Sequence, residues 1–235
     1  MQGIILSFTT MGNSGFCTNV STVVDGTKEQ LRFRKPGNTP MVQSDVHHVV
    51  QGGSLVDAWV PGRMVDFGQY ARPVANHARV THPEDAIVRP RNIRILPSER
   101  LSYGDFINEI SPYFQDSIAD LFPSVQYQGN GKPYVPANTR CTHSVGYITP
   151  ESIEMYQSNG KWYVCVTAGN DSFDAILKDE SLVASLNSSG NTSVSDMSSP
   201  VLRLALAEAF QPYEDVSFRC YVMVTHVIDT VNKEY

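Results

Sequence analysis

The chain has 235 residues, of which 41 % are hydrophobic and 18 % charged, as is usual for a globular protein with a sizeable core. Its formal net charge of −6 argues against a general polyanion binder, because such proteins are basic overall. No apolar run approaches the roughly 18 residues of a spanning helix. We therefore expect a cytoplasmic protein without a membrane segment.

The first part of the chain predicts a succession of short strands. Residues 1–8 form an apolar run, and residues 16–24 alternate and are rich in β-branched side chains. Residues 30–34 alternate apolar and basic side chains, which predicts a strand with one buried face and one face in water. Asp25-Gly26, between the second and third runs, is typical of a two-residue hairpin turn.

One clear helical stretch is predicted, over residues 102–122, where apolar side chains recur at helical spacing. Pro112 must kink or split it, because proline cannot donate the backbone hydrogen bond of a helix interior. Residues 129–139 are rich in Gly, Pro and Asn and are predicted to form a linker. This divides the chain into a first domain over residues 1–128 and a second over residues 140–235.

The second domain is again predicted to be built mainly of strands, with a hairpin turn at Asn159-Gly160. The expected strands cover residues 144–148, 152–156, 161–167, 202–206 and 216–230. Residues 173–186 are predicted to contain a short helix, and the Ser-rich residues 187–199 a surface loop. The predicted fold class is therefore mainly β with a minor helical part.

The residue types that bind metals or carry out catalysis do not form a recognised pattern. The four cysteines are scattered singly, which favours reduced, buried side chains over a zinc site. The densest group of ligand types is His77, His82, Glu84 and Asp85, but its spacing matches no standard metal site. No nucleophile lies beside an identifiable base. The sequence therefore predicts no metal, no cofactor and no enzymatic activity.

Several short motifs, taken in order, resemble the bacterial family of proteins with a dual OB-containing domain. They are the N-terminal apolar strand followed by residues 12–17, and then residues 82–85, 144–154, 161–167, 171–174, 204–210 and 220–224. The resemblance implies two OB-like barrels in tandem with no established activity. By analogy of fold it also implies binding of an oligonucleotide or a protein partner. The family impression further suggests an accessory subunit of a prokaryotic defence or mobile-element system.

The candidate site for single-stranded DNA or RNA lies in the first barrel. Cations at every second position of an outward strand face can follow the phosphates of a single strand, and aromatic rings can stack on its bases. The candidate residues are Arg32, Arg34, Lys35, Arg89, Arg91, Arg94, Tyr70 and Tyr103. The alternative for these arginines is an ordinary solvated strand face.

Charge favours a different function for the second half of the chain. Residues 1–135 hold 12 Lys and Arg against 12 Asp and Glu, whereas residues 136–235 hold 6 against 12. The acidic second barrel therefore favours the alternative of a subunit that docks a catalytic protein partner. If the arginines converge, nucleic acid is favoured; if they pair with Glu84, Asp85 and Glu99, docking is favoured.

Overall fold

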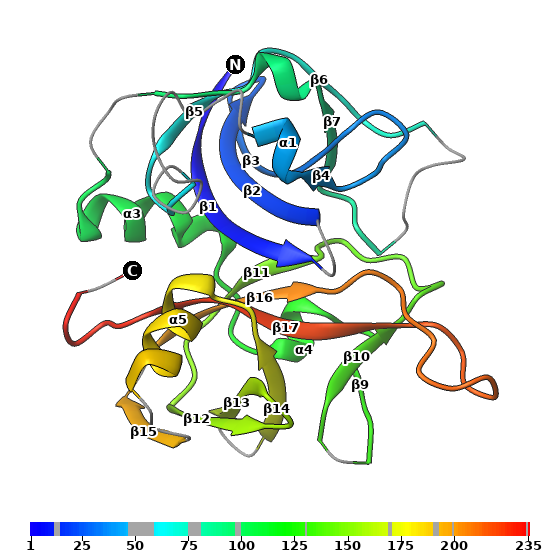
Figure 1. The fold of residues 1–235 in the computed structure, drawn as a ribbon, viewed down its shortest axis with the longest axis vertical. Helices are drawn as coiled ribbons and strands as arrows, with labels where there is room; N and C mark the ends of the chain where they lie inside the picture. The colour runs from blue at the N-terminus through cyan, green and yellow to red at the C-terminus, as the bar shows by residue number, and fades with distance from the viewer. Residues whose placement is uncertain are drawn as a thin grey trace. The chain divides into compact units, whose positions relative to one another are not determined.

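The computed structural model describes residues 1–11, 15–46, 59–74, 81–96, 100–129, 131–168, 171–189, 193–198, 200–233 and 235. The chain forms two units. Unit 1 comprises Met1–Arg79 and Glu84–Pro112, and unit 2 comprises Val80–Pro83 and Tyr113–Tyr235. Each unit is built on one strongly curled sheet with few helices, which confirms the predicted fold class (Figure 1). None of the helices within the described residues is long and apolar enough to cross a membrane.

Unit 1 begins with an antiparallel meander of β1 (Gln2–Met11), β2 (Gly15–Val24) and β3 (Thr27–Arg34). Asp25 and Gly26 join β2 to β3 with φ values of 49° and 80°. Positive φ at both central residues is what this two-residue hairpin turn requires, so the predicted turn is confirmed.

The remaining strands of unit 1 close the sheet into a barrel. β5 (Met64–Asp66) pairs antiparallel with β1, and β7 (Asp85–Val88) pairs in parallel with β3. β6 (Tyr70–Ala71) then pairs with β7, and β8 (Arg94–Ile95) pairs with β5. β5 and β6 follow one another along the chain and pair with β8 and β7, which are also consecutive. Because β5 is paired with β1 and β7 is paired with β3, the pairing of these two segments joins the two edges of the sheet. This strand order, with the third and last strands parallel, is that of an OB barrel.

Short elements complete unit 1. They are β4 (Met41–Val42), α1 (Gln43–Val46) and the 3-10 turn η1 (Pro90–Asn92). The core is formed by side chains from the inner sheet face, including Val20, Leu31, Phe33 and Phe67, all fully buried, and by Trp59, which is 1 % exposed.

Pro112 splits the predicted helix, as expected. α3 (Tyr103–Ile110) ends before the 3-10 turn η2 (Ser111–Tyr113), and α4 (Ile118–Leu121) follows. Ser102 caps α3 by accepting a hydrogen bond from the Asp105 amide, at 3.2 Å. The division between the two units also falls here, after Pro112.

Unit 2 repeats the same plan. Its meander consists of β12 (Ser152–Ser158), β13 (Lys161–Ala168) and β14 (Asp171–Leu177). After α5 (Glu180–Ser189), β15 (Ser193–Ser198) pairs antiparallel with β12, and the consecutive β16 (Val201–Leu206) pairs with β17 (Arg219–Ile228). β17 pairs in parallel with β14. Unit 2 therefore has OB topology, with a helix between the third and fourth strands.

Three short strands extend the sheet of unit 2. β11 (Val145–Ile148) pairs with β16, β10 (Pro133–Pro136) pairs with β17, and β9 (Gln126–Tyr127) pairs with β10. The domain boundary therefore differs from the predicted linker over residues 129–139, which contains β10. Val135 is fully buried in the core of unit 2, so this Gly- and Pro-rich stretch is a hairpin of the unit.

Two further predictions in unit 2 are corrected. Residues 173–186 were expected to hold a helix, but β14 extends to Leu177 and α5 begins only at Glu180. Phe173, Ala175 and Leu177 are buried and alternate with more exposed residues, which is the period of a strand. The Ser-rich residues 187–199 are not simply a loop, because they include the end of α5 and the paired strand β15.

Candidate functional site

Arg32 and Arg34 share one face of β3, as predicted, but that face is buried rather than in water. Arg32 is 3 % exposed and Arg34 is fully buried. Nε and Nη2 of Arg32 each lie 2.5 Å from Oδ1 of Asp85, which β7 places directly opposite Arg32 in the parallel register. Burial lowers the pKa of Arg32, but the attraction of the Asp85 carboxylate outweighs it, so this pKa lies above its ordinary value. Arg32 is therefore a charged partner of Asp85 inside the protein.

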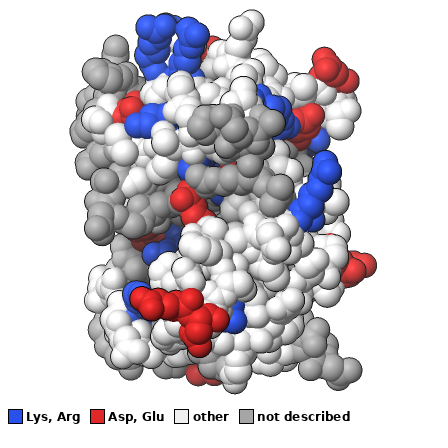
Figure 2. Space-filling view, turned by 90° about the vertical axis from the view of Figure 1, so that its right-hand side faces the viewer, with Lys and Arg blue, Asp and Glu red and all other residues white. Residues whose placement is uncertain are grey.

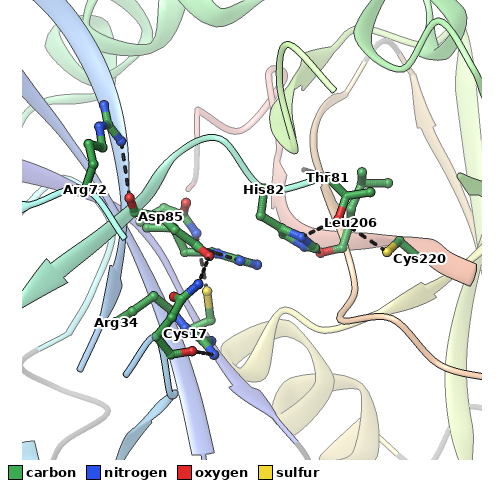
Figure 3. A network of polar contacts seen from close by, with 11 residues as sticks. Cys17, Arg34, Arg72, Thr81, His82, Asp85, Leu206 and Cys220 are labelled. Atoms are coloured by element: carbon green, nitrogen blue, oxygen red, sulfur yellow. Dashed lines mark hydrogen bonds and ion pairs between the residues drawn. The ribbon is translucent and has the colours of Figure 1, made fainter. Parts of the chain in front are cut away.

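Asp85 is the centre of this buried polar network, as Figure 3 shows. Its Oδ2 accepts a hydrogen bond from Nδ2 of Asn38 at 3.0 Å, and the carbonyl of Asn38 accepts one from Nη2 of Arg34 at 2.9 Å. Arg72 donates to the Asp85 carbonyl at 3.3 Å and to the Glu29 carboxylate at 2.7 Å. These bonds join β3, β7 and the segment after β6, so the network stabilises the closed barrel.

Lys35 also has an acidic partner. Its Nζ lies 2.9 Å from Oδ2 of Asp45, and its side chain is 26 % exposed. The three cations of β3 and its end are thus engaged within unit 1. The expectation that they form a solvated basic stripe is therefore corrected, because Arg32 and Lys35 pair with acids and Arg34 is buried with a bond to a backbone carbonyl.

Arg89, Arg91 and Arg94 are in a different environment. They flank or lie within η1, between β7 and β8, and all three are exposed. Within the described part of unit 1, they are the Lys and Arg side chains that make no hydrogen bond or ion pair. Asp66 is the nearest acid by strand register, opposite Arg94. Figure 2 shows Lys and Arg side chains standing out on the upper part of the face drawn there, interspersed with acidic ones.

Of the two predicted aromatic residues, Tyr70 lies next to this segment. It pairs with Val88, the residue before Arg89, and the Arg72 guanidinium lies over its ring at 5.4 Å from the centroid. The ring is half-buried and packs against Phe67. Tyr103 begins α3 and shares no hydrogen bond, ring contact or ion pair with these residues in the described part of unit 1. The structure therefore places Arg89, Arg91 and Arg94 around η1, whereas the Tyr70 ring packs against the core of unit 1 on the strand beside Val88.

His82 does not serve as a ligand with Asp85. It belongs to unit 2, is buried, and its ring nitrogens lie 2.8 Å from Oγ1 of Thr81 and 3.1 Å from the Leu206 carbonyl (Figure 3). His77 lies outside the described residues. None of the four cysteines forms a disulfide, in line with the predicted reduced state, but only Cys17 and Cys220 are buried, and Cys141 and Cys165 are half-buried.

Comparison with known proteins leaves the family open. No family model matches the chain, and no curated protein matches it. Similar solved structures include a p204 HINb domain, 11 % identical over 95 % of each chain with a TM-score of 0.35. They also include a murine DNA-binding protein with double-stranded DNA (8 %, 98 % of each chain, TM-score 0.36). A third is the Ifi202 HINa domain in complex with 20bp dsDNA (7 %, 97 % of this chain and 93 % of that one, TM-score 0.39). Because all three TM-scores are below 0.5, function is argued from this chain's own residues.

The sequence did not predict the outer face of unit 2 as a candidate site. Tyr134, Tyr156, Tyr163 and Tyr221 are half-buried there, on β10, β12, β13 and β17. Part of this face could have been found from the sequence, because the register of the β12–β13 hairpin places Tyr156 opposite Tyr163. Tyr134 and Tyr221 are far apart in sequence and only the β10–β17 pairing joins them.

Proposed function

We propose that this protein is a non-enzymatic nucleic-acid-binding module. In this proposal, Arg89, Arg91 and Arg94 of unit 1 contact the phosphates of a single strand, and the half-buried Tyr70 lies on the neighbouring strand. The observation that carries the proposal is that these three arginines are exposed and lack partners among the described residues, whereas the other candidate cations are engaged. Guanidinium groups bind phosphate oxygens with paired hydrogen bonds, and such contacts supply most non-specific affinity.

The biological setting is proposed on the motif resemblance alone. A bacterial protein with two OB-like barrels in tandem, acting in the cytoplasm as an accessory subunit of a defence or mobile-element system, fits the ordered motifs. OB barrels commonly bind oligonucleotides on one sheet face and its flanking loops, and they do so without covalent chemistry. The arginines would therefore bind the backbone independently of sequence.

Fluorescence anisotropy with a labelled single-stranded 20-mer tests this function. The charge-reversed variant R89E/R91E/R94E is expected to bind at least 100-fold more weakly at low salt, because each lost phosphate contact removes a share of the electrostatic affinity. The matched control is R140E/K178E/K233E, which makes the same change in net charge on unit 2 and should retain most of the affinity. Equal losses in both variants, or no binding by the natural sequence, would reject the proposed site.

A second function is favoured by the charge of unit 2, which holds 7 Lys and Arg against 14 Asp and Glu. An acidic unit repels a nucleic-acid backbone at long range but complements a basic protein surface. In this alternative, unit 2 docks a catalytic protein. Co-purification of a stoichiometric partner that dissociates at high salt would support it, whereas a monomer that captures no partner would count against it.

A further inference from the structure

The outer face of the unit 2 sheet carries a continuous group of half-buried apolar and aromatic side chains. We call it the tyrosine face, and it consists of Tyr134, Tyr156, Tyr163, Ile176, Tyr221 and Met223. Residues that alternate with these along the same strands, such as Trp162, Val164 and Val222, are 3 % exposed or less and form the core. The tyrosines therefore point away from the core by strand periodicity.

Strand register sets these side chains in a row. Tyr156 lies opposite Tyr163, Tyr163 opposite Ile176, and Ile176 opposite Met223. The row crosses four neighbouring strands and is thus about 14 Å long, at 4.7–4.9 Å per strand. Tyr221 lies two residues before Met223 on the same face, and Tyr134 lies opposite Tyr221.

The rings are held in place by one another and by two cations. The Tyr156 and Tyr163 rings stack, with centroids 5.6 Å apart, and Nζ of Lys132 lies 4.7 Å from the Tyr163 centroid. On the neighbouring strands, the Arg219 guanidinium lies 4.1 Å from the centroid of the Tyr134 ring. Rings fixed in this way lose little conformational freedom when a ligand binds, and the two cations cover part of the Tyr163 and Tyr134 rings.

The charge of this face differs from that of the whole unit. Lys132 and Arg219 lie over its rings, and the exposed Lys161 begins β13 on the same side. The acids on this side are Glu154 and Asp174, and Asp174 accepts a hydrogen bond from the Tyr156 hydroxyl. The tyrosine face itself is therefore nearly balanced in charge, although unit 2 is acidic, whereas the adjoining loop over residues 207–218 carries Glu208, Glu214 and Asp215 and no Lys or Arg.

The loop between β16 and β17 extends the aromatic surface. Phe210, Tyr213 and Phe218 in this loop are 58 %, 65 % and 53 % exposed. Phe210 and Arg219 exchange two backbone hydrogen bonds of 2.9 Å, so the loop is anchored to the residue whose guanidinium covers Tyr134. In an OB barrel, the second and third strands and the loop between the fourth and fifth form the usual oligonucleotide groove.

We propose that the tyrosine face and the loop over residues 207–218 hold the unstacked bases of single-stranded nucleic acid, with Lys132 and Arg219 beside its phosphates. This inference rests on the proposed function and adds to it a second contact on unit 2, which binds unstacked bases. A group of tyrosine rings with cations over two of them suits a strand that offers both bases and phosphates. A duplex keeps its bases stacked and would gain nothing from this face.

The test compares three fluorescently labelled probes of equal length on the full chain: dT20, a 20-mer of abasic sugar phosphates, and a duplex. The natural sequence is expected to bind dT20 more tightly than either of the others. Tyr134→Leu and Tyr163→Leu should each weaken dT20 binding about 5- to 100-fold, because one stacking contact is lost, and leave abasic and duplex binding unchanged. Tyr134→Phe and Tyr163→Phe should retain dT20 affinity, because the ring remains.

Tyr127→Leu is the matched control. Tyr127 is exposed on the neighbouring β9, but it pairs with the buried Pro133 and thus lies on the side of the β9–β10 hairpin opposite to Tyr134. This variant should bind dT20 like the natural sequence. Circular dichroism melting checks that every variant is folded.

The outcomes separate this inference from the proposed function. If R89E/R91E/R94E loses affinity for dT20 while the tyrosine variants do not, the function stands and the inference is wrong. Equal binding of dT20 and the abasic probe by the natural sequence has the same meaning. Leucine variants that keep dT20 affinity but lose a protein partner would make the face a protein interface instead. No binding of any probe would overturn both.

Discussion

Asp85 explains why two predicted binding arginines cannot contact a ligand. A buried guanidinium is tolerated only when its charge is neutralised and its donors are hydrogen-bonded. The Asp85 carboxylate forms an ion pair with Arg32 and accepts a hydrogen bond from the side-chain amide of Asn38. The backbone carbonyl of Asn38 in turn accepts a hydrogen bond from Arg34. The arginines of β3 therefore stabilise the barrel. In the proposed function, nucleic acid is bound by the exposed arginines Arg89, Arg91 and Arg94 instead.

Replacing Asp85 should destabilise the protein strongly. Asp85→Asn leaves the Arg32 charge buried without its counter-ion, which costs about 3–5 kcal/mol of unfolding free energy. Glu29→Gln is the matched control, because it removes a carboxylate from an exposed arginine pair and should cost about 1 kcal/mol or less. Urea unfolding followed by circular dichroism measures both. Similar small losses would show that the Asp85 network contributes little to stability.

Tyr156 provides a prediction about pH. Burial, the charge of Asp174 and the hydrogen bond to Asp174 raise the pKa of Tyr156 to about 12. Since this pKa is raised above its unfolded value of about 10, the stabilisation is fully present below pH 10 and is lost as pH rises through 12. The difference in absorbance at 295 nm between the natural protein and Tyr156→Phe should show this late ionisation. Asp174→Asn should bring it closer to 10, and ionisation of Tyr156 near pH 10 in the natural protein would contradict the assignment.

At the scale of elements, the close approach of β1 to β2 depends on Gly3. A Cβ atom at this position would lie 2.4 Å from the backbone oxygen of Ser21 and 2.4 Å from Cγ1 of Val20. Contacts this short force the strands apart. Gly3 therefore fixes how closely the first two strands of the barrel can pair.

Gly3→Ala is thus expected to lower the unfolding free energy by about 1–3 kcal/mol, the usual effect of overpacking. Gly104→Ala is the control, because Gly104 lies on α3 with no atom within 4 Å of an added Cβ. That change should be neutral or stabilise by up to about 1 kcal/mol, since alanine favours the helix. Thermal melts should show a lower melting temperature for Gly3→Ala and an unchanged or higher one for Gly104→Ala, and a Gly3→Ala variant as stable as the natural protein would contradict the close approach of β1 and β2.

Strand hairpins and core faces could be predicted from the sequence because their signals are local. Asp25-Gly26 and Asn159-Gly160 have positive φ at both residues, and Trp59 and Trp162 lie in the cores. Strand periodicity also showed that Arg32 and Arg34 share a face. It could not show that the face is covered, because covering depends on segments distant in sequence.

The misassigned segments have a similar cause. Residues 173–177, at the start of the predicted helix over residues 173–186, belong to a strand because β13 and β17 pair with this strand from both sides. The Gly- and Pro-rich residues before Cys141 resembled a linker, but Tyr134 and Val135 are ordered by pairing with Tyr221 and Cys220. Tyr134 and Val135 lie more than 80 residues from these partners, and Ile176 lies 47 residues from Met223, so neither pairing leaves a trace in a local pattern.

At the scale of the whole molecule, charge is divided between the units. Unit 1 holds 11 Lys and Arg against 10 Asp and Glu, whereas unit 2 holds 7 against 14. A protein with this net charge is not attracted to nucleic acid by its overall electrostatic field. Binding must come from local contacts, which in this account are the arginines around η1 in unit 1 and the aromatic face of unit 2.

The salt dependence of binding to a single-stranded 20-mer tests whether Arg89, Arg91 and Arg94 bind the phosphates of nucleic acid. Three arginines that neutralise three phosphates contribute about −2 to the slope of log affinity against log salt, from roughly 0.7 per contact on a single strand, and any phosphate contacts of Lys132 and Arg219 add to it. The slope should become less negative by about 2 in R89E/R91E/R94E and stay near that of the natural protein in R140E/K178E/K233E. A natural protein whose affinity ignores salt, or a triple variant with an unchanged slope, would contradict the account.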